Sequence, residues 1–215
     1  MDRRQLRAAR RADASGSGPT LGDRPAARFP GATGAFALFG EVLLVGLLMM
    51  IAGLAIVTLP AALAAGIRHL RRYLSAEASP AREFWLDVRR ALPGGLVVGF
   101  AALVLALILA LDIDLAGSGV LPGGAAVAVV GWVGLVVVAV ALLAAAGAWT
   151  PERGWRGAIR VVPAVVAGDV RGALYLAATG VFVGIATWAL VPLIIPALGC
   201  AALAVVAIPA RRRAR

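Results

Sequence analysis

Four long stretches of the chain carry no charged residue, and they constrain the fold more than any other feature. A helix crosses the hydrocarbon core of a bilayer in about 20 apolar residues. Each stretch is long enough for at least one membrane span, and the last is long enough for two spans with a tight turn between them. The stretches run from Val42 to Ile67, Ala91 to Leu111, Leu115 to Pro151 and Gly172 to Ala210.

The composition favours helices over strands in these stretches. Hydrophobic residues make up 61% of the chain and charged residues 15%, whereas soluble domains have about 45–50% and about 25%. The stretches are rich in Leu, Ala and Gly and lack the alternation of a membrane barrel. In lipid every backbone N–H and C=O must be paired within the structure, which favours helices. We therefore predict an all-α fold, an integral membrane helical bundle of about five transmembrane helices with short interfacial amphipathic helices.

We divide the chain into three parts. Residues 1–34 are polar, rich in Arg and without an apolar period, which predicts a disordered N-terminal tail. A transmembrane helical domain follows over residues 35–210, and residues 211–215 form a basic C-terminal tail. The predicted spans cover about residues 35–59, 93–111, 124–149, 173–191 and 193–209.

An amphipathic helix is predicted between the first two spans. Ser79-Pro80 is a helix-start signal, because a hydroxyl residue can cap the helix and proline suits its first position. In the segment from Ala81 to Leu92, Phe84 and Val88 share one face, and most charged side chains lie elsewhere. This pattern is typical of a short helix lying at the membrane interface, separate from the second span.

The positive charge predicts the orientation. The net charge is +10, and all 21 basic residues are arginines outside the apolar runs. The positive-inside rule explains this distribution, so we predict a lipid bilayer as the environment and no nucleic-acid partner. Loops 60–92 and 150–172 and the C-terminus are predicted to be cytoplasmic at the cell membrane. Five spans then leave the N-terminal tail outside. An alternative with six spans, which splits residues 31–67 into a hairpin, avoids this, but no turn is evident near the middle of that segment.

Two hydrophilic segments resemble each other. Residues 79–92 and 150–174 begin Ser-Pro-Ala-Arg and Thr-Pro-Glu-Arg, contain Trp85 and Trp155, and include Asp-Val-Arg-Arg-Ala-Leu and Asp-Val-Arg-Gly-Ala-Leu. Each leads into a pair of spans. One interpretation is a parallel two-helix repeat of the kind found in transporters. The other is chance similarity in a chain of biased composition.

Glu41 is the one carboxylate at the start of an apolar run. An ionisable group inside a bilayer indicates a proton or cation site. Because Glu41 stands near the beginning of the first span, the favoured interpretation is a side chain that reaches the headgroups and stays hydrated. His69, the only histidine, is expected among arginines outside the membrane.

Other reactive groups do not form a catalytic pattern. Asp112 and Asp114 are predicted in a short acidic loop after the second span, and two carboxylates alone make a weak cation site. Cys200 is the single cysteine, so neither an intramolecular disulfide nor a zinc cluster can be built from it. The sequence contains none of the hydrolase, metalloprotease or phosphate-loop motifs. We therefore expect no enzyme activity, no cofactor and no metal site.

The stretch from Gly40 to Leu92 resembles the start of the YesL family of small bacterial multi-pass membrane proteins. Members typically begin with Gly-Asp, followed by an apolar span with a Thr near its end and an Ala-rich helix. An aromatic segment with Arg then leads into the second span. The chain departs from the family where Gly46 replaces a polar Asn, Ala55 a Pro before the Thr, and Pro60 a Gly after it. The matching residues here are Gly40-Glu41, Thr58, Ala61-Ala62-Leu63-Ala64-Ala65, Arg68, Phe84-Trp85 and Arg89-Arg90.

This resemblance implies an accessory role beside carbohydrate uptake and no established activity. Its motif supplies the candidate residues Glu41, Thr58, Phe84, Trp85 and Arg89. The leading hypothesis is an accessory protein, with a carbohydrate ABC importer or another membrane protein as its partner.

Two features separate the leading hypothesis from its alternative. Phe84, Trp85 and Trp155 are expected on the docking surfaces of an accessory protein. Trp85, Trp149 and Trp155 also fall at segment ends, where interfacial anchors belong. The alternative is a small secondary transporter, for which Glu41 would carry the coupled proton or cation.

Overall fold

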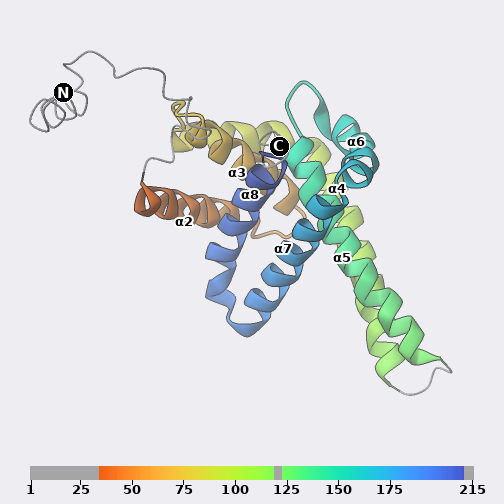
Figure 1. Cartoon of the computed structure of the whole chain (residues 1–215). Coiled ribbons are helices and arrows are strands. Elements are labelled where there is room, and N and C mark those ends of the chain that lie inside the picture. The colour runs from red at the N-terminus through yellow and green to blue at the C-terminus, as the bar shows by residue number, and fades with distance from the viewer. Residues whose placement is uncertain (1–33, 119–122, 211–215) are drawn as a thin grey trace, which may run out of the picture.

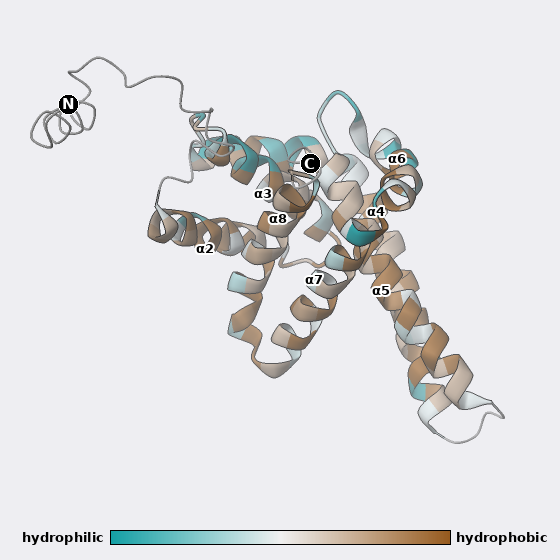
Figure 2. Cartoon of the chain, in the orientation of Figure 1, coloured by the Kyte–Doolittle hydropathy of each residue, from teal (hydrophilic) through white to brown (hydrophobic). Residues whose placement is uncertain are grey.

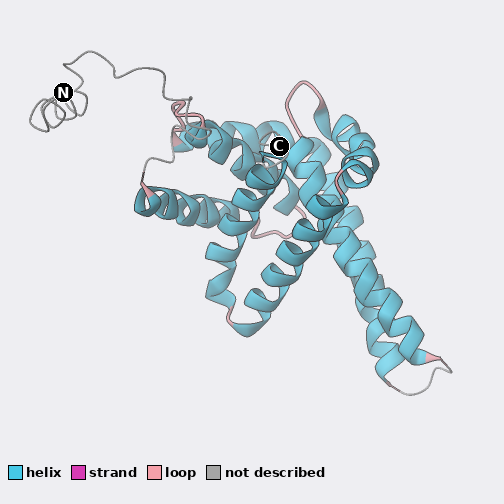
Figure 3. Cartoon of the chain, in the orientation of Figure 1, coloured by secondary structure: helices cyan, strands magenta, loops and turns pink. Residues whose placement is uncertain are grey.

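The computed structural model describes residues 34–118 and 123–210 of the chain. The predicted tails, apart from Gly34, and part of the loop after the second predicted span lie outside these residues. Within them the chain forms helices and turns and no strand (Figure 3), which confirms the predicted all-α fold. The helices are α2 (Ala35–Ala52), α3 (Leu59–Leu74), α4 (Ala81–Gly117), α5 (Gly124–Ala148), α6 (Gly154–Gly168), α7 (Val170–Ala189), the 3-10 turn η1 (Val191–Leu193) and α8 (Ile194–Ala210).

Five helical segments in the described part of the chain are long and apolar enough to cross a membrane. They are α2, α4, α5, α7 and the segment formed by η1 and α8. Their outer surfaces are apolar along the α4–α5 and α7–α8 pairs (Figure 2). Trp132 is 61% exposed and Trp188 92% exposed. Exposing such area to water costs about 25 cal/mol per Å², whereas lipid accepts it, so the chain is a helical membrane bundle.

The first helix is shorter than predicted, because the chain turns back on itself at residues 53–58. α2 ends at Ala52, and α3 returns along it: Gly66 lies against Met49, and His69 reaches Glu41. Contacts in this descending order make α2 and α3 an antiparallel hairpin. The turn that the sequence had not revealed is therefore present, although α3 is not among the five candidate spans.

The predicted amphipathic helix and the predicted second span form one continuous helix, α4, of 37 residues. Pro93 lies inside it and removes one backbone hydrogen bond without ending the helix. The predicted acidic loop at Asp112 and Asp114 is also helical, because α4 continues to Gly117. Both predicted breaks were wrong. A long helix can continue through a proline where neighbouring helices support it.

α3 lies at the centre of the bundle and packs against α2, α4, α5 and α8. Its residues 61–65 are buried, because their mostly small side chains let neighbouring helices approach closely. α2 and α8 cross at two glycines. A Cβ on Gly46 would collide with the carbonyl of Ile195, and one on Gly199 with the carbonyl of Val42. Close packing of this kind holds helices together in lipid, where the hydrophobic effect between them is weak.

The two long helix pairs diverge from a common end of the molecule. α4–α5 and α7–α8 extend away from the end where α6 lies, and the last residues of α8 lie at that same end (Figure 1). α2 runs antiparallel to α8, since Val42 contacts Gly199 and Gly46 contacts Ile195. The beginning of α2 also lies beside the arginine-bearing part of α3, where Glu41 meets His69.

The two segments that resemble each other in sequence have different structures. Residues 81–92 begin the continuous helix α4. In contrast, α6 ends before α7, and Asp169 stands between them and accepts a hydrogen bond from the Gly172 N–H at 2.9 Å. Asp87, which aligns with Asp169 in sequence, is buried inside α4. The matched residues thus do not share an environment.

Candidate functional site

A buried carboxylate joins α3 to α4. Asp87 is 1% exposed, and its Oδ2 accepts hydrogen bonds from Arg68 Nε at 3.1 Å and from Arg72 Nη1 at 2.9 Å. Arg68 and Arg72 are one turn apart on α3 and therefore share a face. The sequence placed Asp87 with the outward charges of an amphipathic helix, which was wrong. The four-residue spacing of Arg68 and Arg72 was a signal for an acidic partner, but it did not show which acid.

A second polar contact joins α2 to α3. His69 Nε2 lies 2.6 Å from Glu41 Oε1, and His69 is 1% exposed. The sequence did not predict that the two side chains meet within the hairpin, while a hydrated Glu41 and a His69 outside the membrane stay predictions. His69 Nδ1 and Asp87 Oδ1 are buried without a hydrogen-bond partner in the described residues. Each of these two buried atoms could therefore form one further hydrogen bond.

Phe84 belongs to the core, not to a docking surface. It is fully buried, and its ring meets His69 edge-on with centroids 6.5 Å apart and Trp85 with centroids 5.3 Å apart. It thus packs against the His69 ring from the side of α4. The expectation that Phe84 is a docking residue was wrong, because α3 covers the face of α4 that carries it.

Trp85 and Arg89 remain accessible. Trp85 is 39% exposed, and both Arg82 and Arg89 are exposed. Positions 82, 85 and 89 recur at helical spacing and therefore share one side of α4. We call these three residues the α4 outer face. It combines one aromatic ring with two guanidinium groups beside the buried contacts of the same helix.

Trp155 holds α6 against α4. Its Nε1–H donates to the Ala91 carbonyl at 2.8 Å, and the ring fills the space left by Gly94 and Gly95 next to Pro93. A Cβ at Gly94 would lie 2.7 Å from Trp155 Cδ1. Trp155 is 6% exposed, so its predicted roles in docking and as an interfacial anchor were wrong. Trp155 therefore has a structural role, because its ring fills the space beside Gly94 and Gly95.

Trp149 is also buried rather than an interfacial anchor. It is 1% exposed, its ring lies 6.3 Å from that of Trp155, and the Arg68 guanidinium lies 5.8 Å from its centroid. A cation over an aromatic face is attracted by the ring. Arg68 is therefore held from two sides, by Asp87 and by Trp149.

Thr58 closes the α2–α3 turn. Its Oγ1–H donates to the Ala52 carbonyl at 2.6 Å, which satisfies one of the carbonyls that the end of α2 leaves unpaired. Ile56 in the same turn has a positive φ of 54°, a strained conformation for a β-branched residue. Thr58 thus has a structural role in the turn.

Metal ligands do not gather in the described part of the chain, where no three His, Cys, Asp or Glu side chains come together. Asp112 and Asp114 are neighbours on α4, and Cys200 is an exposed free thiol on α8. The site is therefore a set of ionic and aromatic contacts around α3, with the α4 outer face beside it.

Fold and site together define an α-helical, multi-pass membrane protein whose central helix is tied by buried ionic pairs. Compared with family models, curated proteins and solved structures, the chain shows no match in any of the three comparisons.

Proposed function

We propose that this chain is a non-enzymatic accessory protein of the cell membrane that docks on a partner membrane protein through the α4 outer face. The observation that carries the proposal is the exposure of Trp85 between Arg82 and Arg89 on a helix whose opposite side is anchored by Asp87. Trp and Arg are the residues most enriched in binding hot spots. A rigid helix presents them without the cost of ordering a backbone segment at binding.

The partner that fits this face carries an acidic cytoplasmic surface. Two arginines on one face complement carboxylates, and the positive-inside rule assigns this arginine-rich end to the cytoplasm. The resemblance to the YesL family points to a carbohydrate ABC importer as that partner. Asp87, Arg68 and Arg72 are engaged with one another, which fits a structural role for these three charges.

Site-specific photocrosslinking tests this proposal. A photoreactive amino acid is introduced at Trp85 in the full chain in native membranes, and at the exposed Arg156 of α6 as a control position. We expect a protein crosslink from position 85 that contains an importer subunit, and none from position 156. The double variant Arg82→Glu with Arg89→Glu should weaken co-purification of that subunit at least tenfold, while Arg156→Glu leaves it unchanged. Crosslinks to lipid alone from position 85 would contradict the proposal.

A second candidate function is a small proton- or cation-coupled transporter. One observation favours it: Glu41 and His69 form a close pair inside the hairpin, and His69 Nδ1 has no partner among the described residues. Intramembrane carboxylate and histidine groups are the parts of proton relays. In this case the pair would exchange a proton during the transport cycle.

Flux measurements in reconstituted vesicles separate the two functions. If the chain is a transporter, Glu41→Gln abolishes coupled uptake, Glu41→Asp keeps part of it, and Arg156→Gln leaves it unaffected. Absence of flux above empty vesicles for candidate sugars, with or without a proton gradient, would count against transport and leave the accessory function.

A further inference from the structure

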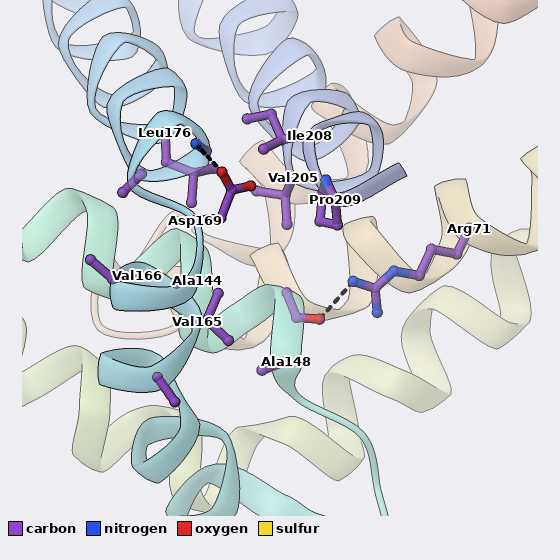
Figure 4. Close-up of a pocket in the computed structure, with 14 residues that line it drawn as sticks. Arg71, Ala144, Ala148, Val165, Val166, Asp169, Leu176, Val205, Ile208 and Pro209 are labelled. Atoms are coloured by element: carbon purple, nitrogen blue, oxygen red, sulfur yellow. Dashed lines mark hydrogen bonds between the residues drawn. The ribbon is translucent and has the colours of Figure 1, made fainter. Parts of the chain in front are cut away.

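A cavity lies between the last turns of α5, α6 and α8 and the first turns of α7, and no residue of the α4 outer face lines it. Its volume is about 330 Å³, at the lower end of the range for ligand pockets. Most of its wall is apolar, with Ala144, Val165, Leu176, Val205 and Ile208 among the lining residues (Figure 4). The wall thus suits a hydrocarbon segment.

Two charged residues line the cavity, and they come from different walls. Arg71 reaches it from α3, and its Nη2–H donates to the Gly147 carbonyl at 2.6 Å, which holds the guanidinium at the edge of the cavity (Figure 4). Asp169 lies near the start of α7, where its Oδ1 accepts from the Gly172 N–H. The polar groups are therefore concentrated at the edge of an otherwise apolar space.

The charge balance around Arg71 favours an anion. Within the described residues, Arg71 makes no ion pair with a carboxylate, and the neighbouring Arg68 and Arg72 share the single carboxylate of Asp87. Three guanidinium groups on adjacent turns of α3 thus stand near two acids, Asp87 and the Asp169 that lines the cavity, which leaves one positive charge in excess. Within the described residues Arg71 donates one hydrogen bond, from Nη2 to the Gly147 carbonyl, and its other N–H groups can meet a ligand oxygen.

We propose that this cavity binds a glycerophospholipid, with its phosphate on Arg71 and the first part of an acyl chain against Leu176, Val205 and Ile208. Arg recognises phosphate in a planar, bidentate geometry. The cavity is smaller than a whole lipid, but it is partly open, so the remainder of the lipid lies along the outside of α7 and α8. The inference is independent of docking through the α4 outer face.

Native mass spectrometry of the detergent-purified full chain tests the proposal. Phosphatidylglycerol is titrated against the wild type and two variants, Arg71→Gln and Ala173→Leu, the second of which fills the cavity with a larger side chain. We expect one tightly retained lipid on the wild type and a loss of affinity of about ten- to a hundredfold in each variant. Arg156→Gln, which removes an exposed arginine from α6, is the matched control and should bind like the wild type.

Two further ligands separate the chemistry of the site. Inorganic phosphate alone and diacylglycerol without a phosphate should each bind at least tenfold more weakly than phosphatidylglycerol. Equal binding of inorganic phosphate would reduce the site to an anion site, and equal binding of diacylglycerol would reduce it to an apolar cleft; either result overturns the proposal. Thermal unfolding verifies that each variant is folded. If Arg71→Gln does not fold, unchanged lipid binding by a folded Ala173→Leu still overturns it.

Discussion

At the scale of single residues, the main consequence of the structure is that side chains of similar chemistry on α4 have opposite roles. Phe84 and Trp85 are adjacent aromatic residues, yet one is fully buried and the other 39% exposed. Asp87 and Glu83 are both acids, yet only Asp87 is held by two arginines. Substitutions in these two pairs therefore separate the core of the bundle from its outer surface.

Removing the Asp87 charge should destabilise the bundle. Asp87→Asn keeps the shape but leaves Arg68 and Arg72 without their shared anion. Breaking a buried ion pair costs about 3–5 kcal/mol; because Arg68 is partly exposed and Asn keeps an acceptor oxygen, we expect about 2 kcal/mol here. Thermal unfolding in detergent measures the effect, with Glu83→Gln as the control on the same helix, expected within about 0.5 kcal/mol of wild type. Equal unfolding temperatures for both variants would show that the ion pairs of Asp87 with Arg68 and Arg72 do not stabilise the bundle.

Phe84→Ala and Trp85→Ala should differ in what they damage. Truncating a buried Phe costs about 3–5 kcal/mol, so Phe84→Ala should lower the unfolding temperature markedly. Trp85→Ala should change stability little and should instead weaken association with the docked partner. Measuring unfolding and co-purification on both variants tests this division; a large loss of stability in Trp85→Ala alone would reverse the assignment.

At the scale of elements, the helix crossings depend on glycine. Gly46→Ala places a Cβ against the Ile195 carbonyl, where rigid backbone has to move, whereas Gly40 of the same helix has no atom within 4 Å of an added Cβ. We expect Gly46→Ala to cost about 1–3 kcal/mol. Gly40→Ala should be neutral or stabilising by up to about 1 kcal/mol, because Ala is the better helix former. Chemical denaturation in mixed micelles compares the two, and an equal response would mean that α2 and α8 do not cross as described.

The elements differ in how far sequence alone could predict them. The uncharged runs predicted helices because lipid leaves the backbone few alternatives. The turn at residues 53–58 was missed because Ile56, at a positive φ, is not a residue that signals a left-handed conformation. The turn depends on contacts distant in sequence, such as Val57 against Gly99. Likewise, the sequence did not predict the burial of Trp155, because its place beside Gly94 depends on how α6 packs against α4.

At the scale of the whole molecule, the antiparallel α2–α3 hairpin changes the expected side of the N-terminus. With a single first span, the tail containing Arg24 and Arg28 had to lie outside, against the positive-inside rule. Because α3 returns along α2, the start of α2 lies beside the arginine-bearing part of α3, where Glu41 meets His69. Gly117 lies at the other end of α4. The arginine-rich segments can then all face the cytoplasm.

Topology mapping in sealed, right-side-out vesicles tests this arrangement. Tags at the N-terminus and after Arg215 should both be protected from added protease, because both termini are expected inside. In a Cys200→Ala background, which removes the single native thiol, Gly117→Cys should react with a membrane-impermeant maleimide. Arg156→Cys should react only after the vesicles are opened. An N-terminal tag cleaved from outside, beside a protected C-terminal tag, would restore a single span over residues 35–59 and would refute the hairpin.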